Sequence, residues 1–249
     1  MRLTVVGCAG TFPGPSSPCS SYLLEEDGFR LLVDAGNGST GILQRVCGLL
    51  DLDAVVVSHL HGDHYLDLVT YTYARRYHPD GPVGCLPVHG PREIAHHVAS
   101  AFGRPVDELL AEVYEFHPIE RPGVLEVGPF TIDLDRVNHP VETYGMRITA
   151  GGRTLTYSAD TGVSDELVKL ARGSDLFLCE ASYLEGDVNP PNVHLTGREA
   201  AEHAARADVG RLVLTHLVPW GDRDRSLAEA HEAFDGDISV ASSGAVLDV

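Results

Sequence analysis

The sequence has very little lysine and few positive charges of any kind. Lys169 is the only lysine, and 36 acidic residues outnumber 18 basic ones, which gives a net charge of −18. Nucleic-acid backbones attract positively charged protein surfaces, so this balance disfavours nucleic acid as a partner. A local basic pocket stays compatible with it.

Long apolar runs and paired cysteines are also missing. No apolar run approaches the length of a membrane span, and the N-terminus lacks the apolar region and cleavage site of a signal peptide. The five cysteines are scattered and form no C-x-x-C pair, a distribution typical of buried free thiols in a reducing compartment. We therefore expect a cytoplasmic protein that makes no contact with a membrane.

The expected elements come in two rounds of strands followed by helices. Strands are expected at 3–6, 21–26, 29–34, 54–57, 83–89, 113–118, 124–127, 130–137, 143–150, 154–159, 176–180, 211–215 and 238–241, and helices at 41–50, 63–77, 92–102, 165–172, 197–207 and 227–234. The chain shows no solenoid repeat and no low-complexity linker. This pattern predicts one α/β domain over residues 1–249, built from two related halves.

The most informative stretch is Val55–Leu68, which reads V-V-V-S-H-L-H-G-D-H-Y-L-D-L. A β-branched apolar run ends at Ser58, and four metal-type side chains follow within six residues: His59, His61, Asp63 and His64. His59 and His61 are two apart, so both can project the same way from extended chain. A cluster of imidazoles and a carboxylate without cysteine favours zinc, with manganese or iron as alternatives.

The pattern H-x-H-x-D-H after an apolar strand resembles the metallo-β-lactamase superfamily. The resemblance is expected to cover the whole chain. It implies a four-layer αββα sandwich, a site for two divalent metal ions and three further ligands downstream.

Three ligand-type residues stand directly after apolar strands, as the resemblance requires: His139, Asp160 and His216. By resemblance, one ion is held by His59, His61 and His139, the other by Asp63, His64 and His216, and Asp160 bridges both. The two ions would generate a bridging hydroxide, and Asp63 would accept its hydrogen bond. The β-lactamases of this superfamily carry cysteine where Asp160 stands, which argues against β-lactam hydrolysis.

A further motif runs N-V-H-L-T-G-R-E-A-A-E-H-A from Asn192, and L-C-E-A-S-Y lies upstream of it. Its His194 and Glu180 resemble a pair in the ribonuclease Z-like branch, which includes cyclic-nucleotide phosphodiesterases. There the histidine contacts the scissile phosphate and helps to protonate the leaving oxygen, while the glutamate orients it. His194 could instead neighbour a helix cap, and Glu180 could pair with an arginine.

Other residues receive plainer interpretations. Asp67 is expected to support a neighbouring histidine, and the loop at 7–21 to form part of a site wall. Arg75, Arg76 and Trp220 could touch a substrate at a pocket rim, but solvent-exposed positions are favoured. Most of the remaining histidines are expected on the surface; they are His78, His89, His96, His97, His117, His203 and His231.

These features predict a metal-dependent hydrolase that cleaves a small phosphodiester such as 3′,5′-cyclic AMP. Three alternatives stay open: a lactone or thioester hydrolase, a ribonuclease Z-type RNA 3′-processing endonuclease, and a binding module that uses metal only for structure. No glycine-rich basic arm of the ribonuclease Z kind is visible between His64 and His139. A homodimer is compatible with the sequence, which leaves the oligomeric state open.

Overall fold

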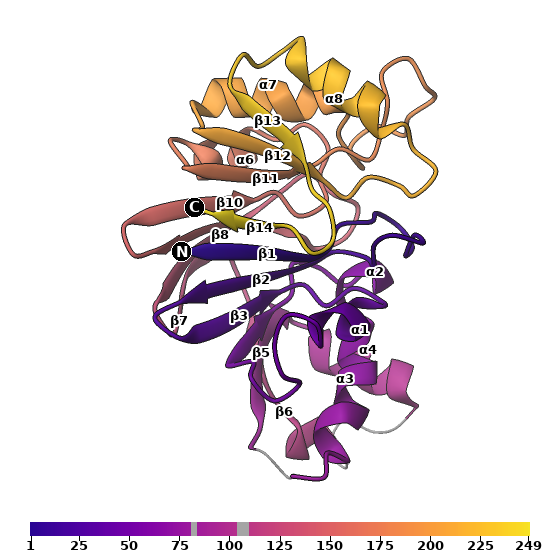
Figure 1. The fold of residues 1–249 in the computed structure, drawn as a ribbon, viewed down its shortest axis with the longest axis vertical. Helices are drawn as coiled ribbons and strands as arrows, with labels where there is room; N and C mark the ends of the chain where they lie inside the picture. The colour runs from indigo at the N-terminus through magenta and orange to yellow at the C-terminus, as the bar shows by residue number, and fades with distance from the viewer. Residues whose placement is uncertain (81–83, 104–109) are drawn as a thin grey trace.

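The computed structural model describes residues 1–80, 84–103 and 110–249. Two seven-stranded sheets pack face to face, and each carries helices on its outer face (Figure 1). This is the four-layer αββα sandwich of the predicted α/β class. Within the described residues, no helix has both the length and the apolar character that crossing a bilayer requires. That residues 1–249 form a single domain stays a prediction.

The first sheet has the order β14-β1-β2-β3-β4-β5-β6, and its strands β3 to β6 run parallel. Its members are β1 (Arg2–Gly7), β2 (Ser21–Glu26), β3 (Phe29–Val33), β4 (Ala54–Val56), β5 (Leu86–Pro91), β6 (Tyr114–Ile119) and β14 (Val246–Asp248). Its helices are α1 (Ser39–Leu43), α2 (Gly62–Tyr65), α3 (Asp67–Arg76) and α4 (Ile94–Phe102), with a 3₁₀ turn η1 at Leu110–Glu112.

The second sheet has the order β13-β12-β11-β10-β9-β8-β7, and its strands β10 to β13 run parallel. Its members are β7 (Gly123–Val127), β8 (Phe130–Arg136), β9 (Tyr144–Ala150), β10 (Arg153–Tyr157), β11 (Leu176–Glu180), β12 (Arg211–Thr215) and β13 (Asp237–Val240). Helices α6 (Asp165–Ala171), α7 (Gly197–Ala207) and α8 (Arg223–His231) cover its outer face (Figure 1).

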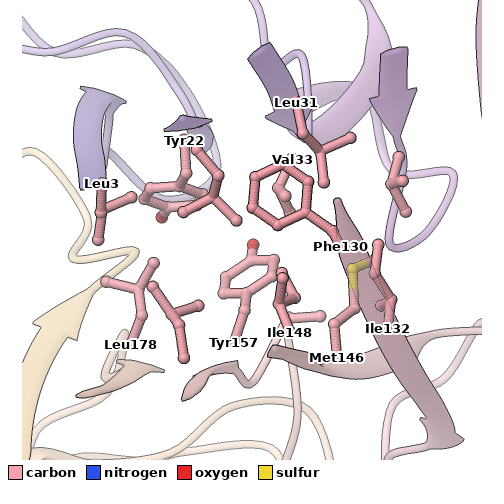
Figure 2. Packing of buried hydrophobic residues seen from close by; sticks show 14 of the residues in the cluster. Leu3, Tyr22, Leu31, Val33, Phe130, Ile132, Met146, Ile148, Tyr157 and Leu178 are labelled. Carbon is pink, nitrogen blue, oxygen red and sulfur yellow. The ribbon is translucent and has the colours of Figure 1, made fainter. Parts of the chain in front are cut away.

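Apolar side chains from both sheets meet in a shared central core. Figure 2 shows Tyr22 and Val33 of the first sheet facing Phe130, Met146 and Tyr157 of the second. Two outer cores fill the spaces between each sheet and its helices. Since a sheet with both faces covered can be apolar on both, the parallel strands read as continuous apolar runs.

Several elements differ from the sequence expectation. Helix α1 covers Ser39–Leu43 instead of 41–50, and α8 covers Arg223–His231 instead of 227–234. The helix expected at 63–77 is broken at Leu66, because the backbone of Ala35 accepts from Asp67 N (2.9 Å) and donates to His64 O (2.7 Å). The strand expected at 83–89 is β5, Leu86–Pro91, and Val83 lies outside the described residues. The last strand is β14, which pairs with β1 and brings the two termini side by side (Figure 1).

Candidate metal centre

The predicted ligands all follow strand ends at one edge of the two sheets. His59 follows β4, and Gly62 then starts α2, which carries Asp63 and His64. In the second sheet, β8, β10 and β12 are followed by His139, Asp160 and His216. The carboxyl ends of parallel strands are where α/β folds place their sites.

Several of these strand ends have left-handed backbone at residues other than glycine. Asp34 after β3 has φ 59°, Ala159 after β10 has φ 53° and His216 after β12 has φ 56°. Such a conformation is uncommon for residues with a side chain and costs roughly 1–2 kcal/mol. Strain of this kind concentrates at functional sites, where it turns a side chain in a required direction.

Two overlapping groups of donors result. In each group the ligand atoms all lie within 4.8 Å of one another: His59, His61, His139 and Asp160 in one, and Asp63, His64, His216 and Asp160 in the other. His139 Nε2 lies 3.2 Å from His61 Nδ1, and His64 Nε2 lies 3.2 Å from His216 Nε2. Asp160 belongs to both groups, with Oδ1 3.2 Å from His64 Nε2 and Oδ2 3.6 Å from His59 Nε2.

Hydrogen bonds on the far side of the rings set their tautomers. His64 Nδ1 donates to Asp34 Oδ2 at 2.7 Å, and His139 Nδ1 donates to the Val193 carbonyl at 2.8 Å. His216 Nδ1 lies 2.8 Å from Ser182 Oγ, whose hydroxyl donates to the His216 carbonyl. In the neutral rings the lone pair is therefore on Nε2, and these Nε2 atoms converge on the centre.

Unpartnered atoms mark the same point. His59 Nε2 and Asp160 Oδ1 are buried and find no hydrogen-bond partner among the residues that the structure describes. Converging lone pairs and a buried carboxylate oxygen are unfavourable alone, but a divalent cation between them would satisfy both. Nitrogen and oxygen donors without thiolate suit zinc, manganese or iron. The residues present thus fit a bound metal.

The electrostatics agree with this arrangement. Burial lowers the pKa of His59, His61 and His139, so these rings are neutral and can offer a lone pair. Burial also opposes ionisation of Asp160, but His216 and His64 outweigh it and hold the carboxyl pKa well below its usual value. Burial likewise opposes protonation of His64, but Asp160 and Asp34 outweigh it and raise the pKa of His64 well above its usual value. Metal binding needs a neutral imidazole and an ionised carboxylate, so a cation would replace the proton on His64.

Asp34 is the residue that the sequence analysis missed. Its buried carboxylate accepts from Ser58 N (2.7 Å), Ser58 Oγ (2.8 Å), His64 Nδ1 (2.7 Å) and Tyr157 Oη (2.8 Å). It therefore orients His64. The sequence carries one clue, because Asp34 also stands at the end of an apolar strand, as the predicted ligands do.

The role expected for Asp67 was wrong. Its carboxylate accepts from Gly38 N at 3.0 Å, Thr40 N at 2.6 Å and Ser39 Oγ at 3.3 Å. Asp67 thus satisfies backbone groups at the start of α1 rather than a histidine. Because the expected helix is broken at Leu66, Asp67 begins α3, and its side chain reaches the start of α1.

The loop at 7–21 forms part of the site wall, as expected. Thr11 N donates to Asp63 Oδ2 at 2.8 Å. Gly10 packs against His216 so closely that a Cβ there would lie 2.4 Å from the His216 carbonyl oxygen. This contact requires glycine at position 10.

His194 and Glu180 form an ion pair beside the two donor groups. His194 Nδ1 lies 2.8 Å from Glu180 Oε1, and the pair forms a third donor group with His216. Glu180 is fully buried and also accepts from Thr161 N (2.9 Å) and Ser182 N (3.1 Å). Burial lowers the pKa of His194, but Glu180 outweighs this effect and raises the pKa to about 9.

Two surface assignments were also wrong. His203 is buried, with Nε2 accepting from Ser164 N (3.0 Å) and Nδ1 donating to Glu199 O (2.7 Å). Arg75 is buried and donates to Gly84 O at 2.7 Å. Both residues lie on helix faces that pack inward. A single charged or polar residue in a helix gives no sign in the sequence of whether it is buried or exposed.

Comparison with known proteins gives the family. The β-lactamase superfamily domain matches residues 29–217. The uncharacterized protein ML1173 of Mycobacterium leprae is 41% identical over 100% of this chain and 89% of its own length. Ribonuclease Z of Nocardia farcinica is 29% identical over 96% of this chain and 95% of its own length.

The probable metallo-hydrolase YhfI of Bacillus subtilis is 32% identical over 99% of both chains. A crystal structure of YhfI superposes with a TM-score of 0.88 over 99% of this chain and 98% of its own. The match covers both sheets and the edge that carries the two donor groups. The chain therefore belongs to the metallo-β-lactamase superfamily and is a metallo-hydrolase.

Proposed function

We propose that the chain is a dinuclear phosphodiesterase that acts on a small substrate such as 3′,5′-cyclic AMP. One ion would be held by His59, His61 and His139 and the other by Asp63, His64 and His216, with Asp160 between them. When bound, the two ions supply an activated water and stabilise charge on phosphoryl oxygens. Zinc as the metal, a cytoplasmic location and a homodimer stay predictions.

The observation that carries the phosphodiester assignment is the His194–Glu180 pair. Glu180 accepts a hydrogen bond from His194 Nδ1 (2.8 Å) and is itself held in place by two backbone amides. The imidazole of His194 is therefore fixed in one orientation. His194 lies next to His139 and His216, with ring centroids 5.5 Å from each. A proton on its Nε2 is thus available to a phosphoryl oxygen or a leaving oxygen at the site.

Replacing His194 tests this role. His194→Ala should lower kcat for 3′,5′-cyclic AMP by about 10²–10⁴-fold, the usual contribution of a positioned acid, with both metals retained. The loss should be smaller for bis(p-nitrophenyl) phosphate, whose leaving group needs little protonation. Equal losses would make His194 a binding residue only, and no loss on either substrate would remove the reason for preferring phosphodiesters.

Ribonuclease Z activity is the second candidate, since a protein of that name is 29% identical to this chain. Two observations speak against it. The net charge is −18, and the match to that relative extends over 300 positions, so the relative carries segments that this 249-residue chain lacks. Binding of tRNA should accordingly be weak and should fall steeply with salt.

A substrate panel separates these candidates. Protein loaded with zinc or manganese is assayed with 3′,5′-cyclic AMP, bis(p-nitrophenyl) phosphate, a lactone, a thioester and a precursor tRNA. We expect hydrolysis of the small phosphodiesters. Specific 3′ cleavage of the precursor tRNA, or turnover of the lactone or thioester alone, would overturn the proposal.

A further inference from the structure

Two loops that leave the metal centre run side by side. Ala9 bridges Leu217, and Gly10 N donates to Leu217 O at 3.1 Å. Further along, Gly14 packs against Pro219, since a Cβ there would lie 3.0 Å from the proline Cβ. Residues 9–14 and 217–221 thus form one continuous piece of the surface.

Both loops are tied to proposed metal ligands. Thr11, in the first loop, donates its N–H to Asp63 Oδ2 and has a left-handed backbone at φ 67°. The second loop starts at His216 and turns back within a few residues, since Gly221 N donates to Val218 O at 2.8 Å. Trp220 is only four residues from His216, so its backbone lies within roughly 14 Å of that ligand.

The two loops bring Phe12 and Trp220 together. Their ring centroids are 4.6 Å apart with an angle of 34° between the planes. Trp220 is 76% exposed, whereas Phe12 is half-buried and supports it. The indole is therefore held on one side by Phe12 and is open to solvent elsewhere.

We propose that Trp220, supported by Phe12, stacks on the aromatic base of the substrate while the phosphodiester lies at the metal centre. An exposed aromatic ring in a fixed place is the usual platform for a nucleobase, because every base offers a π-face. A tryptophan with two side-chain torsions loses little entropy when it makes this contact. The inference rests on the proposed phosphodiesterase function and specifies a base-bearing nucleotide as its substrate class.

A binding experiment tests the platform without turnover. Trp220 is the only tryptophan, so intrinsic fluorescence reports on this side chain alone. AMP should quench the fluorescence of the metal-loaded protein, and ribose 5-phosphate, which lacks the base, should not. Equal responses to the two ligands, or no response to AMP, would overturn the proposal.

Kinetics give the second test. Trp220→Ala should raise KM for 3′,5′-cyclic AMP roughly 5- to 150-fold, the equivalent of ~1–3 kcal/mol per stacked base. KM for an abasic ribose 3′,5′-cyclic phosphate should stay unchanged, and Trp220→Phe should restore most of the loss. Tyr77→Ala, which removes another exposed aromatic side chain (67% exposed), is the matched control and should have no effect.

The outcomes separate this proposal from the proposed function. Quenching by AMP without phosphodiester hydrolysis would leave the platform standing and remove the assigned reaction. Hydrolysis of 3′,5′-cyclic AMP with an unchanged KM in Trp220→Ala would leave the reaction and remove the platform. A change in sedimentation of Trp220→Ala without any change in ligand response would assign Trp220 to an interface between copies of the chain instead.

Discussion

Asp160 is the residue that the two donor groups share. If one carboxylate serves two cations, Asp160→Ala should reduce the metal content for both ions together, as measured by elemental analysis after metal-replete expression. His64→Ala is the matched control and should lose mainly one of the two. Retention of both ions and of full activity in Asp160→Ala would show that Asp160 does not bridge.

Asp34 is not among the predicted metal ligands, but it accepts a hydrogen bond from one of them, His64. It holds His64 Nδ1 at 2.7 Å, so Asp34→Asn should weaken binding of the ion at His64 by roughly 10–100-fold, the usual effect of losing such a support. Asparagine tolerates the left-handed backbone at φ 59°, which limits the strain of the exchange.

Tyr157→Phe provides the control for this variant. It removes one of the donors to Asp34 and leaves the bond to His64, so its metal affinity should change far less. Competition with a chromogenic chelator measures both variants. Equal losses would mean that the Asp34 network acts as a whole rather than through His64.

At the scale of the elements, the buried His203 connects α7 to Ser164, the N-cap residue of α6. His203 is neutral in the folded protein, accepts from Ser164 N and donates to Glu199 O, and burial lowers its pKa. Below about pH 6.5 the unfolded chain takes up a proton that the folded chain does not, so this stability is present above pH 6.5 and is lost as pH falls.

His203→Gln should therefore reduce the acid dependence of stability. Denaturant unfolding of the metal-loaded protein at about pH 7.5 and pH 5.5 should show a smaller fall for the variant than for the wild type. His231→Gln, at the C-terminal end of α8, is the matched control and should keep the wild-type dependence. The same fall in all three proteins would contradict a role for His203.

At the scale of the whole molecule, the centre joins the two halves. His59, His61, Asp63 and His64 come from the first sheet, and His139, Asp160 and His216 come from the second. A cation that binds only the folded chain stabilises it by ~2.7 kcal/mol when its concentration is a hundred times Kd.

Removal of metal by a chelator should therefore lower Tm by roughly 5–10 °C for each ion lost, as calorimetry or a thermal-shift assay would show. Adding the ion back should restore it. A Tm that does not respond to chelation, in protein shown to have lost its metal, would mean that the two sheets need no cation to stay together.

Particular residues show how far sequence reasoning reached. The donors from His59 to His64 could be located because four ligand types follow one apolar strand within six residues. His139, Asp160 and His216 are isolated residues, and they were predicted because the family resemblance implies three further ligands and each of these residues follows an apolar strand. Asp34 satisfies the same rule but was missed, because a carboxylate that supports a ligand looks the same in sequence as one that caps a turn.

The sequence by itself determined the elements and the kind of chemistry. Apolar periodicity specifies which segments are strands and helices, and local spacing specifies the imidazole and carboxylate donors, since both depend on neighbours along the chain. Tertiary structure alone decided what depends on distant partners. The insertion of Ala35 between His64 and Asp67, the pairing of β14 with β1 and the contact of Phe12 with Trp220 each join segments far apart in sequence, which no local pattern encodes.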